Sequence, residues 1–213
     1  MDFSGISNQF DLIKKPVLER IHNVLKHGKF IMGPEVFELE ERLAKLINCK
    51  YCVTTSSGTD SLLIALMAIG VKEGDEVITT PFSWISNVEM ITLLGAKPVF
   101  ADICHDTYNL DANKLDSLIT KKTKAIMPVS LFGQCCNMDK INNIASEHNL
   151  KVIEDAAQSF GSKYKGKYSC NLSDIGCTSF FPTKPLGGYG DGGACFTNNE
   201  NLANTMAKIR LHG

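Results

Sequence analysis

Residues 51–70 of the chain read YCVTTSSGTDSLLIALMAIG and combine three local signals. β-branched residues dominate Tyr51–Thr55, which predicts a strand, and the apolar positions of Asp60–Ile69 predict a helix that Gly70 closes. A strand that passes through a short Ser/Gly turn into a helix is the repeating unit of α/β folds. This stretch therefore predicts an α/β domain.

The same alternation continues on both sides of this unit. Further strands are expected at Glu76–Thr80, Pro98–Ala101, Ala125–Val129, Lys151–Glu154, Cys177–Phe181 and Ala194–Thr197. Helices are expected at Pro16–Lys26, from Pro34 onward, and at Asn87–Leu94, Asn113–Ile119, Asp139–His148 and Asn201–Arg210. Such a pattern predicts a mainly parallel central sheet with helices on both faces. Because no linker interrupts it, residues 1–213 are expected to form one domain.

Composition favours a small-molecule partner. The chain of 213 residues has 44% hydrophobic residues, 21% charged residues and a formal net charge of −1, which suits a globular protein with an ample core. Its near-neutral balance, with Lys and Arg scattered, argues against nucleic-acid binding. No apolar run is long enough for a membrane helix, and Met1–Phe10 lacks the pattern of a targeting signal. We therefore expect a cytoplasmic protein.

The eight cysteines are expected to be reduced thiols. Cys49 and Cys52 form a C-x-x-C pair, but a zinc site would need a second pair and a redox site would need a thioredoxin-like context. Neither is present in the sequence, and the five histidines have no metal-ligand spacing. We predict no metal site.

The turn Ser57-Gly58-Thr59 lies where a strand passes into a helix. Backbone N–H groups and the positive end of the helix dipole point at such a turn, which suits a phosphate. A Ser or Thr here can equally serve only as a helix cap, and the turn alone does not separate the two interpretations.

Asp155 ends the predicted strand 151–154, at the edge where open α/β sheets place ligands. A carboxylate in this place can pair with a protonated pyridine nitrogen, as a pyridoxal phosphate site requires. An acidic residue at a strand end is more often a helix cap or a solvated charge. Gln158 follows at capping-box spacing, so its simplest interpretation is also local.

Lys184 lies in the sequence SFFPTKPLGG, residues 179–188. Pro182 and Pro185 restrict the loop around the lysine, and the phenylalanines before it provide apolar surroundings that disfavour the ammonium form. Most lysines are solvated, so position alone proves little. A lysine held beside apolar groups is nevertheless the kind that forms an imine with a carbonyl compound.

Two other features need care. Gly188, Gly190 and Gly193 match G-x-G-x-x-G, but they follow a proline-rich loop and precede a strand, whereas a dinucleotide site needs a helix there. We therefore reject that interpretation. Trp84 can stack on a planar ring or fill the core, and without context the core is the simpler expectation.

Taken together, these segments resemble the DegT/DnrJ/EryC1/StrS sugar aminotransferases in both order and spacing. The resemblance covers essentially the whole chain and rests on S-G-T at 57–59, Trp84, E-D-A-A-Q at 154–158, S-F-F-P-T-K at 179–184 and G-D-G-G at 190–193. Within the family, residues 128–135 and 169–173 look most like enzymes that aminate UDP-2-acetamido-2-deoxy-3-oxo-glucuronic acid for lipopolysaccharide.

The resemblance implies a fold-type I large domain, similar to aspartate aminotransferase, that binds pyridoxal 5′-phosphate. Lys184 would form the Schiff base with this cofactor, Asp155 would hold the pyridine nitrogen, and Gln158 would contact the ring oxygen. Trp84 would stack on the ring. The phosphate would lie against Ser57, Gly58, Thr59 and Ser179. Glutamate would donate the amino group to a keto sugar attached to a nucleotide, and the enzyme would be a homodimer.

Two departures and two rival functions remain. Phe160 stands where many family members have histidine, and family members continue into a small C-terminal domain that is expected to be absent from this chain. One rival is a pyridoxamine phosphate-dependent sugar dehydratase of the same family, which has histidine in place of Lys184. The other is a non-catalytic fragment that only binds the cofactor.

Overall fold

The computed structural model describes residues 5–212; Met1–Ser4, part of the N-terminal stretch considered above, and Gly213 lie outside the described residues. A seven-stranded sheet has the order β1-β9-β8-β5-β4-β2-β3. The strands are β1 (Tyr51–Thr55), β2 (Glu76–Thr79), β3 (Lys97–Phe100), β4 (Thr123–Ile126), β5 (Lys151–Asp155), β8 (Ile175–Ser179) and β9 (Gly193–Thr197).

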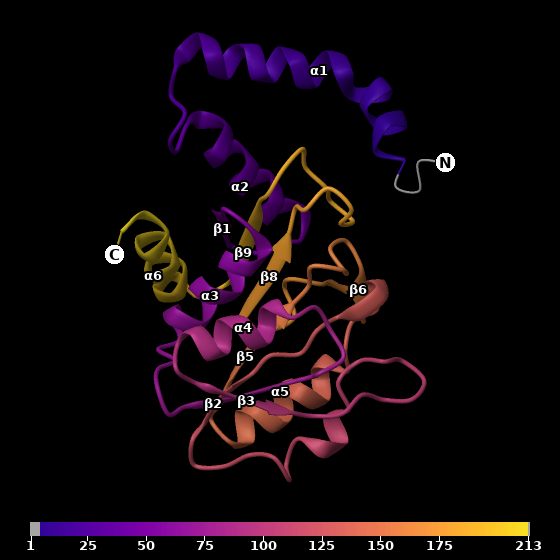
Figure 1. The fold of residues 1–213 in the computed structure, drawn as a ribbon, viewed down its shortest axis with the longest axis vertical. Helices are drawn as coiled ribbons and strands as arrows, with labels where there is room; N and C mark the ends of the chain where they lie inside the picture. Colours follow the sequence, from indigo (N-terminus) through magenta and orange to yellow (C-terminus); the bar gives the residue numbers. More distant parts are fainter. Residues whose placement is uncertain (1–4, 213) are drawn as a thin grey trace.

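Strand direction places the site. The pairs β2–β3, β2–β4, β4–β5 and β5–β8 are parallel, while β9 runs antiparallel to both of its neighbours, β8 and β1. The predicted mainly parallel sheet is therefore confirmed (Figure 1). Parallel strands end at one common edge, so the residues that follow β2, β5 and β8 lie at the same edge of the sheet.

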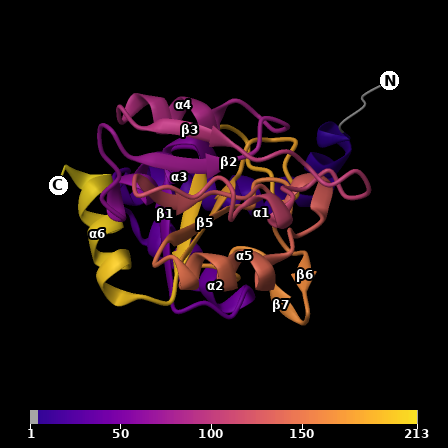
Figure 2. The same cartoon turned by 90° about the horizontal axis from the view of Figure 1, so that it is seen from below.

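Helices cover both faces of the sheet (Figure 2). On one face, Leu66 of α3 and Ile91 of α4 pack in one core cluster with Ile153 of β5. On the other face, Ile141 of α5 packs with Val152. The helices are α1 (Ile6–His27), α2 (Pro34–Leu46), α3 (Gly58–Ala68), α4 (Ser86–Leu93), α5 (Met138–Glu147) and α6 (Glu200–Leu211). Neighbouring side chains on β5 thus anchor opposite layers.

Three elements differ from the sequence prediction. The helix α1 begins at Ile6 and contains Pro16. The sequence had predicted that this helix starts at Pro16, because proline is common at the first position of a helix. The predicted helix 113–119 is wrong: only a short 3-10 turn, η1 (Ala112–Lys114), forms, because the Asp111 side chain accepts from Asn113 N and caps a turn instead. The hairpin β6 (Lys163–Tyr164) and β7 (Lys167–Tyr168) was not predicted. None of the helices among residues 5–212 is long and apolar enough to cross a membrane.

Candidate active site

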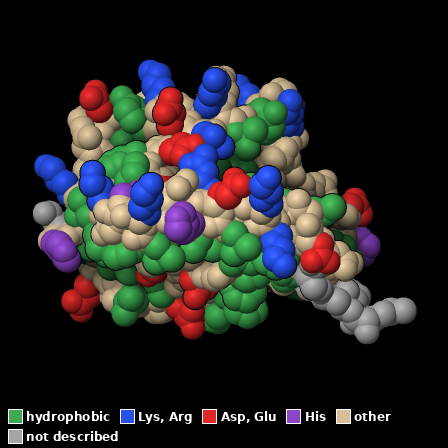
Figure 3. All heavy atoms as spheres, turned by 90° about the horizontal axis from the view of Figure 1, so that it is seen from above, with side chains coloured by type: hydrophobic (Ala, Val, Ile, Leu, Met, Phe, Trp, Pro, Cys, Tyr) green, Lys and Arg blue, Asp and Glu red, His purple; other side chains and the backbone are tan. Residues whose placement is uncertain are grey.

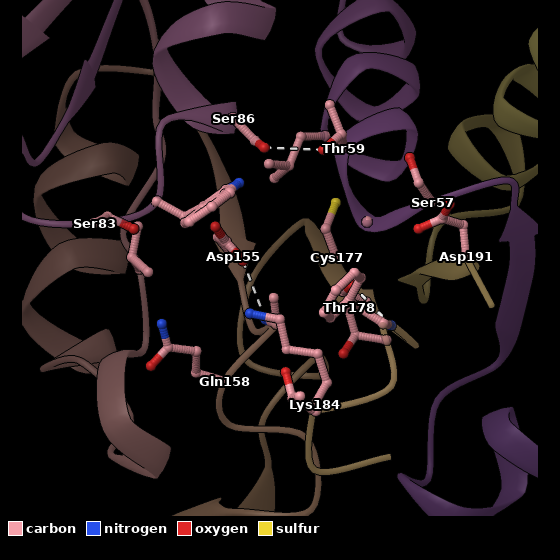
Figure 4. A pocket seen from close by; sticks show the side chains of 18 residues that line it. Ser57, Thr59, Ser83, Ser86, Asp155, Gln158, Cys177, Thr178, Lys184 and Asp191 are labelled. Atoms are coloured by element: carbon pink, nitrogen blue, oxygen red, sulfur yellow. Dashed lines mark hydrogen bonds between the residues drawn. The ribbon is translucent and has the colours of Figure 1, made fainter. Parts of the chain in front are cut away.

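A cavity of about 260 Å³ lies at the carboxyl ends of β5 and β8, beside the first turn of α3 (Figure 4). The structure brings all of the predicted site residues into its lining: Ser57, Gly58, Thr59, Trp84, Asp155, Gln158, Ser179 and Lys184. They come from segments up to 127 residues apart (184 − 57). The sequence alone could not establish that these segments meet around one space.

The first turn of α3 forms one end of the cavity. Ser57 caps the helix, because its Oγ accepts from Asp60 N at 3.0 Å and donates to Asp60 Oδ2 at 2.8 Å. The capping interpretation of Ser57 is therefore right for its side chain. The first helical backbone bond runs from Ser61 N to Ser57 O, so the N–H groups of Gly58 and Thr59 precede the hydrogen-bonded turns. These two groups remain available to an anion.

Gly58 is needed for close packing at this end. A Cβ on Gly58 would lie 2.5 Å from the Cβ of Ser179 and 3.0 Å from its Oγ. Ser179 ends β8, so the glycine lets the helix approach the strand closely enough for both residues to line the cavity. Thr59 is held in place on its other side, where its Oγ1 lies 2.9 Å from Ser86 Oγ.

Replacing Gly58 with alanine should therefore push α3 and β8 apart. We expect a loss of about 1–3 kcal/mol in the free energy of unfolding, the usual result of overpacking, measured by urea denaturation. Gly188→Ala is the matched control, because a Cβ on Gly188 would meet its nearest atom at an ordinary 3.5 Å. Equal stability of the two variants would contradict this account of the cavity end.

Asp155 forms the floor of the cavity at the end of β5. Its side chain is buried, with the residue only 6% exposed, and its Oδ1 accepts from Ala157 N at 3.1 Å. Burial raises the pKa of Asp155, while the Ala157 N–H, the charge of Lys184 and the Asn87 amide oppose this shift. The alternative of a solvated charge is therefore wrong. A buried carboxylate with so few partners is suited to a cationic group of a ligand.

Lys184 reaches the cavity from a tightly folded loop. Its backbone N–H donates to Phe181 O at 2.8 Å, and Gly188 N donates to Phe180 O at 2.7 Å, so the loop closes on itself. Figure 4 shows the Lys184 side chain extending toward Asp155. The expected apolar surroundings are incomplete, because Phe181 is half exposed and the nearby carboxylate is the charged neighbour of the amine. The amine of Lys184 and the carboxylate of Asp155 thus face each other in the cavity.

Gln158 has an unexpected partner. Its Oε1 accepts from the backbone N–H of Phe132 at 3.0 Å, so the predicted local capping role is wrong. Phe132 has a φ of 54°, which is uncommon for an aromatic residue, and lies in the short turn η2 (Leu131–Gly133). Because the N–H must meet the amide oxygen, the Nε2 donor of Gln158 faces the cavity (Figure 4). The site therefore offers a hydrogen-bond donor to a ligand oxygen.

Trp84 is 72% exposed and lines the cavity, so the core interpretation is wrong. The sequence analysis missed other lining residues, among them Ser83, Ser86, Thr178 and Asp191. Ser83 and Ser86 follow β2, and a signal for them existed, since β2 ends at the same edge as β5. Ser83 Oγ is buried and has no hydrogen-bond partner among the described residues, which leaves it free for a ligand.

The chain is similar to known aminotransferases over nearly its whole length. Residues 11–213 match the model of the DegT/DnrJ/EryC1/StrS aminotransferase family. The chain is 55% identical over its whole length to a UDP-2-acetamido-2-deoxy-3-oxo-D-glucuronate aminotransferase of Pseudomonas aeruginosa and covers 59% of that protein. It thus spans less than two thirds of the length of this relative.

Solved structures show the same fold. A DegT DnrJ EryC1 StrS aminotransferase from Brucella abortus superposes with a TM-score of 0.97 at 37% identity, covering 100% of this chain and 59% of that one. NtdA from Bacillus subtilis, solved with bound cofactor PMP, superposes with a TM-score of 0.88 at 38% identity, covering 93% and 45%. The fold is therefore shared with about half of the length of these aminotransferases. This chain belongs to the DegT/DnrJ/EryC1/StrS aminotransferase family.

Proposed function

We propose that this chain binds pyridoxal 5′-phosphate and transfers an amino group from glutamate to a keto sugar carried by a nucleotide. The observation that carries the proposal is the facing pair of Lys184 and Asp155 across one cavity whose far end is the first turn of α3. The relative from P. aeruginosa supports a UDP-3-keto-hexuronate or a similar sugar as the acceptor. Such a product would serve the synthesis of surface polysaccharides, including lipopolysaccharide.

The residues present fit this cofactor. An anion such as its phosphate suits the N–H groups of Gly58 and Thr59, and a Cβ on Gly58 would close that space against Ser179. The buried Asp155 carboxylate suits a cationic ring nitrogen, and the Nε2 of Gln158 suits the ring oxygen. Trp84 offers an exposed aromatic face for stacking. Each end of the cavity thus complements a different part of the same molecule.

In the proposed reaction, each residue has a separate task. Pyridoxal phosphate, when bound, supplies a carbonyl group for imine exchange and a ring that accepts electrons. Asp155 holds the ring nitrogen in its protonated form, because a buried carboxylate favours a positive charge beside it. Lys184 would hold the cofactor through its Nζ, and this Nζ, as a free amine, would act as the base that moves the proton of the donor's α-carbon. Thr59 and Ser179 keep the phosphate end fixed.

The direct test is to load the chain with pyridoxal phosphate, reduce it with borohydride and map the adduct by mass spectrometry. We expect one adduct, on Lys184, and turnover when glutamate and the nucleotide keto sugar are supplied. A colourless protein without an adduct would overturn the proposal. An adduct on Lys184 without turnover would instead favour the cofactor-binding fragment, an alternative that the 59% coverage of the relative keeps relevant. The dehydratase alternative is disfavoured, since a lysine occupies position 184.

A homodimer in the cytoplasm is the corresponding proposal for the assembly and location of this chain. Figure 3, which looks onto the side where α1 lies, has hydrophobic side chains exposed among Lys and Arg. On α1 itself Leu12, Leu18 and Leu25 are exposed, and such a surface favours a covering partner. Light scattering on the loaded sample should give about twice the 23.4 kDa of one chain, and a single-chain mass would contradict the dimer.

A further inference from the structure

Asn87 is a buried polar residue that the proposed reaction does not yet use. It is the second residue of α4 and is only 1% exposed. Neither its Nδ2 nor its Oδ1 has a hydrogen-bond partner among the described residues. A buried amide without partners costs free energy, and native proteins rarely retain one without a reason. The burial of Asn87 therefore calls for a functional explanation.

The neighbour that provides this explanation is Asp155. Asn87 is one of the groups that lower the pKa of the Asp155 carboxyl, although neither polar atom of its amide has a hydrogen-bond partner of ordinary geometry among the described residues. The other groups that favour the ionised carboxylate are the Ala157 N–H and the charge of Lys184. When Lys184 is joined to the cofactor, the amine no longer serves Asp155 as a free ammonium. The support that then remains on the protein side is the Ala157 N–H and Asn87.

We propose that Asn87 is a positioning residue, whose amide holds the Asp155 carboxylate in place to pair with the ring nitrogen of the cofactor. The inference rests on the proposed function. This role explains why the Asn87 amide is kept in the core without a partner. Its N–H donor would support the Asp155 carboxylate when that carboxylate pairs with the cationic ring nitrogen. The neighbouring Ser86 faces a different group, Thr59 Oγ1 at 2.9 Å, so α4 serves both ends of the cavity.

The stability of the free protein distinguishes this role from a purely structural one. If Asn87 only held the fold together, its replacement would lower the melting temperature of the free protein. Leucine has the same branching as asparagine and lacks the polar atoms that have no partner in the cofactor-free chain. Asn87→Leu should therefore leave the melting temperature of the free protein unchanged or raise it, because an apolar group of similar shape removes a buried polar cost.

The experiment measures the affinity for pyridoxal phosphate and the melting temperature of each variant. We expect Asn87→Leu to bind pyridoxal phosphate about tenfold or more weakly, the size of one hydrogen bond to a charged group. Ile91→Val is the matched control, since Ile91 is fully buried one turn further along α4. This variant should lose melting temperature while keeping its affinity.

A cofactor analogue separates the ring nitrogen from all other contacts. In 1-deaza-pyridoxal phosphate a C–H group replaces the ring nitrogen, so Asp155 has no cation to meet. Wild type and Asn87→Leu should bind this analogue equally. The inference is overturned if the variant binds pyridoxal phosphate as well as wild type, loses affinity equally for both compounds, or loses melting temperature together with affinity.

Two further outcomes keep the test decisive. If the leucine variant does not fold, Asn87→Ala undergoes the same comparison with both compounds, and equal losses for the two overturn the inference. If wild type acquires no adduct on Lys184, the proposed function itself fails. If wild type acquires the adduct and only the difference between the two compounds is absent, the proposed function stands and the role of Asn87 fails.

Discussion

Lys184→Ala is expected to lower the rate of amino transfer by about 10²–10⁴-fold, the usual contribution of a general acid–base residue. The loss should be at the upper end of this range, because in the proposed function the same side chain also attaches the cofactor. The substitution should leave the fold intact, since Lys184 lies in a loop and its backbone bond to Phe181 O does not need the side chain. Steady-state kinetics with glutamate and a nucleotide keto sugar measure the rate.

Two further variants test whether the amine of Lys184 is the group that activity requires. Lys167→Ala, in the hairpin β6–β7, removes an exposed lysine that does not line the cavity and should keep wild-type activity. Lys184→Arg retains the positive charge and should be as inactive as the alanine variant, because a guanidinium stays protonated and does not form the imine. Rescue of Lys184→Ala by an added small primary amine would identify the amine as the missing group. Activity of Lys184→Ala near the wild-type level would contradict the assignment.

The regular elements could largely be predicted from the sequence, because their signals are local. The β-branched run of β1 and the apolar period of α5 needed no knowledge of distant contacts. Reliance on local signals also explains why residues 113–119 were wrongly predicted to form a helix. Their apolar spacing suits a helix, but so short a helix has little stability of its own, and the Asp111 cap favours a turn. Leu115 is fully buried without being part of a helix.

The site could be predicted in part. Asp155 follows a strand whose end is marked in the sequence, and the turn at 57–59 has a recognisable composition, so local rules reached both. The orientation of Gln158 depends on Phe132, which lies 26 residues away in the chain, and the importance of Asn87 depends on the absence of partners in a folded core. Neither fact has a local signature. Such properties arise only when separate segments are packed together.

The largest effect on stability is expected at Glu154, the residue before Asp155. Its carboxylate is fully buried and accepts three hydrogen bonds of 2.8 Å, from Ser130 Oγ, Ser169 Oγ and Cys170 N. Glu154→Leu would leave these three donors without their acceptor. The expected loss in the free energy of unfolding is about 3–5 kcal/mol, a large part of the total stability of a typical domain.

Glu154→Gln is the matched variant, because an amide keeps the shape and can still bond the serine hydroxyls. We expect it to cost about 1 kcal/mol or less near neutral pH. Urea denaturation of the three proteins measures the difference. Similar losses in the glutamine and leucine variants would mean that shape or the negative charge, rather than the hydrogen bonds, matters at this position.

Glu154 should also make the stability of the protein depend on pH. Burial raises the pKa of Glu154, with the charge of Asp155 adding to the shift and the three hydrogen bonds opposing it. The native chain then binds more protons than the unfolded chain between the ordinary glutamate pKa of about 4.3 and the raised native pKa. Its contribution to stability is therefore complete below that range and is lost as the pH rises through the native pKa. Carboxylates with a lowered pKa, such as Glu38 beside Arg20, have the opposite effect, since their contribution to stability is lost as the pH falls.

Unfolding free energies measured from pH 4 upward should decline less steeply in Glu154→Gln than in wild type. Parallel curves for the two proteins would show that Glu154 does not titrate differently in the folded chain.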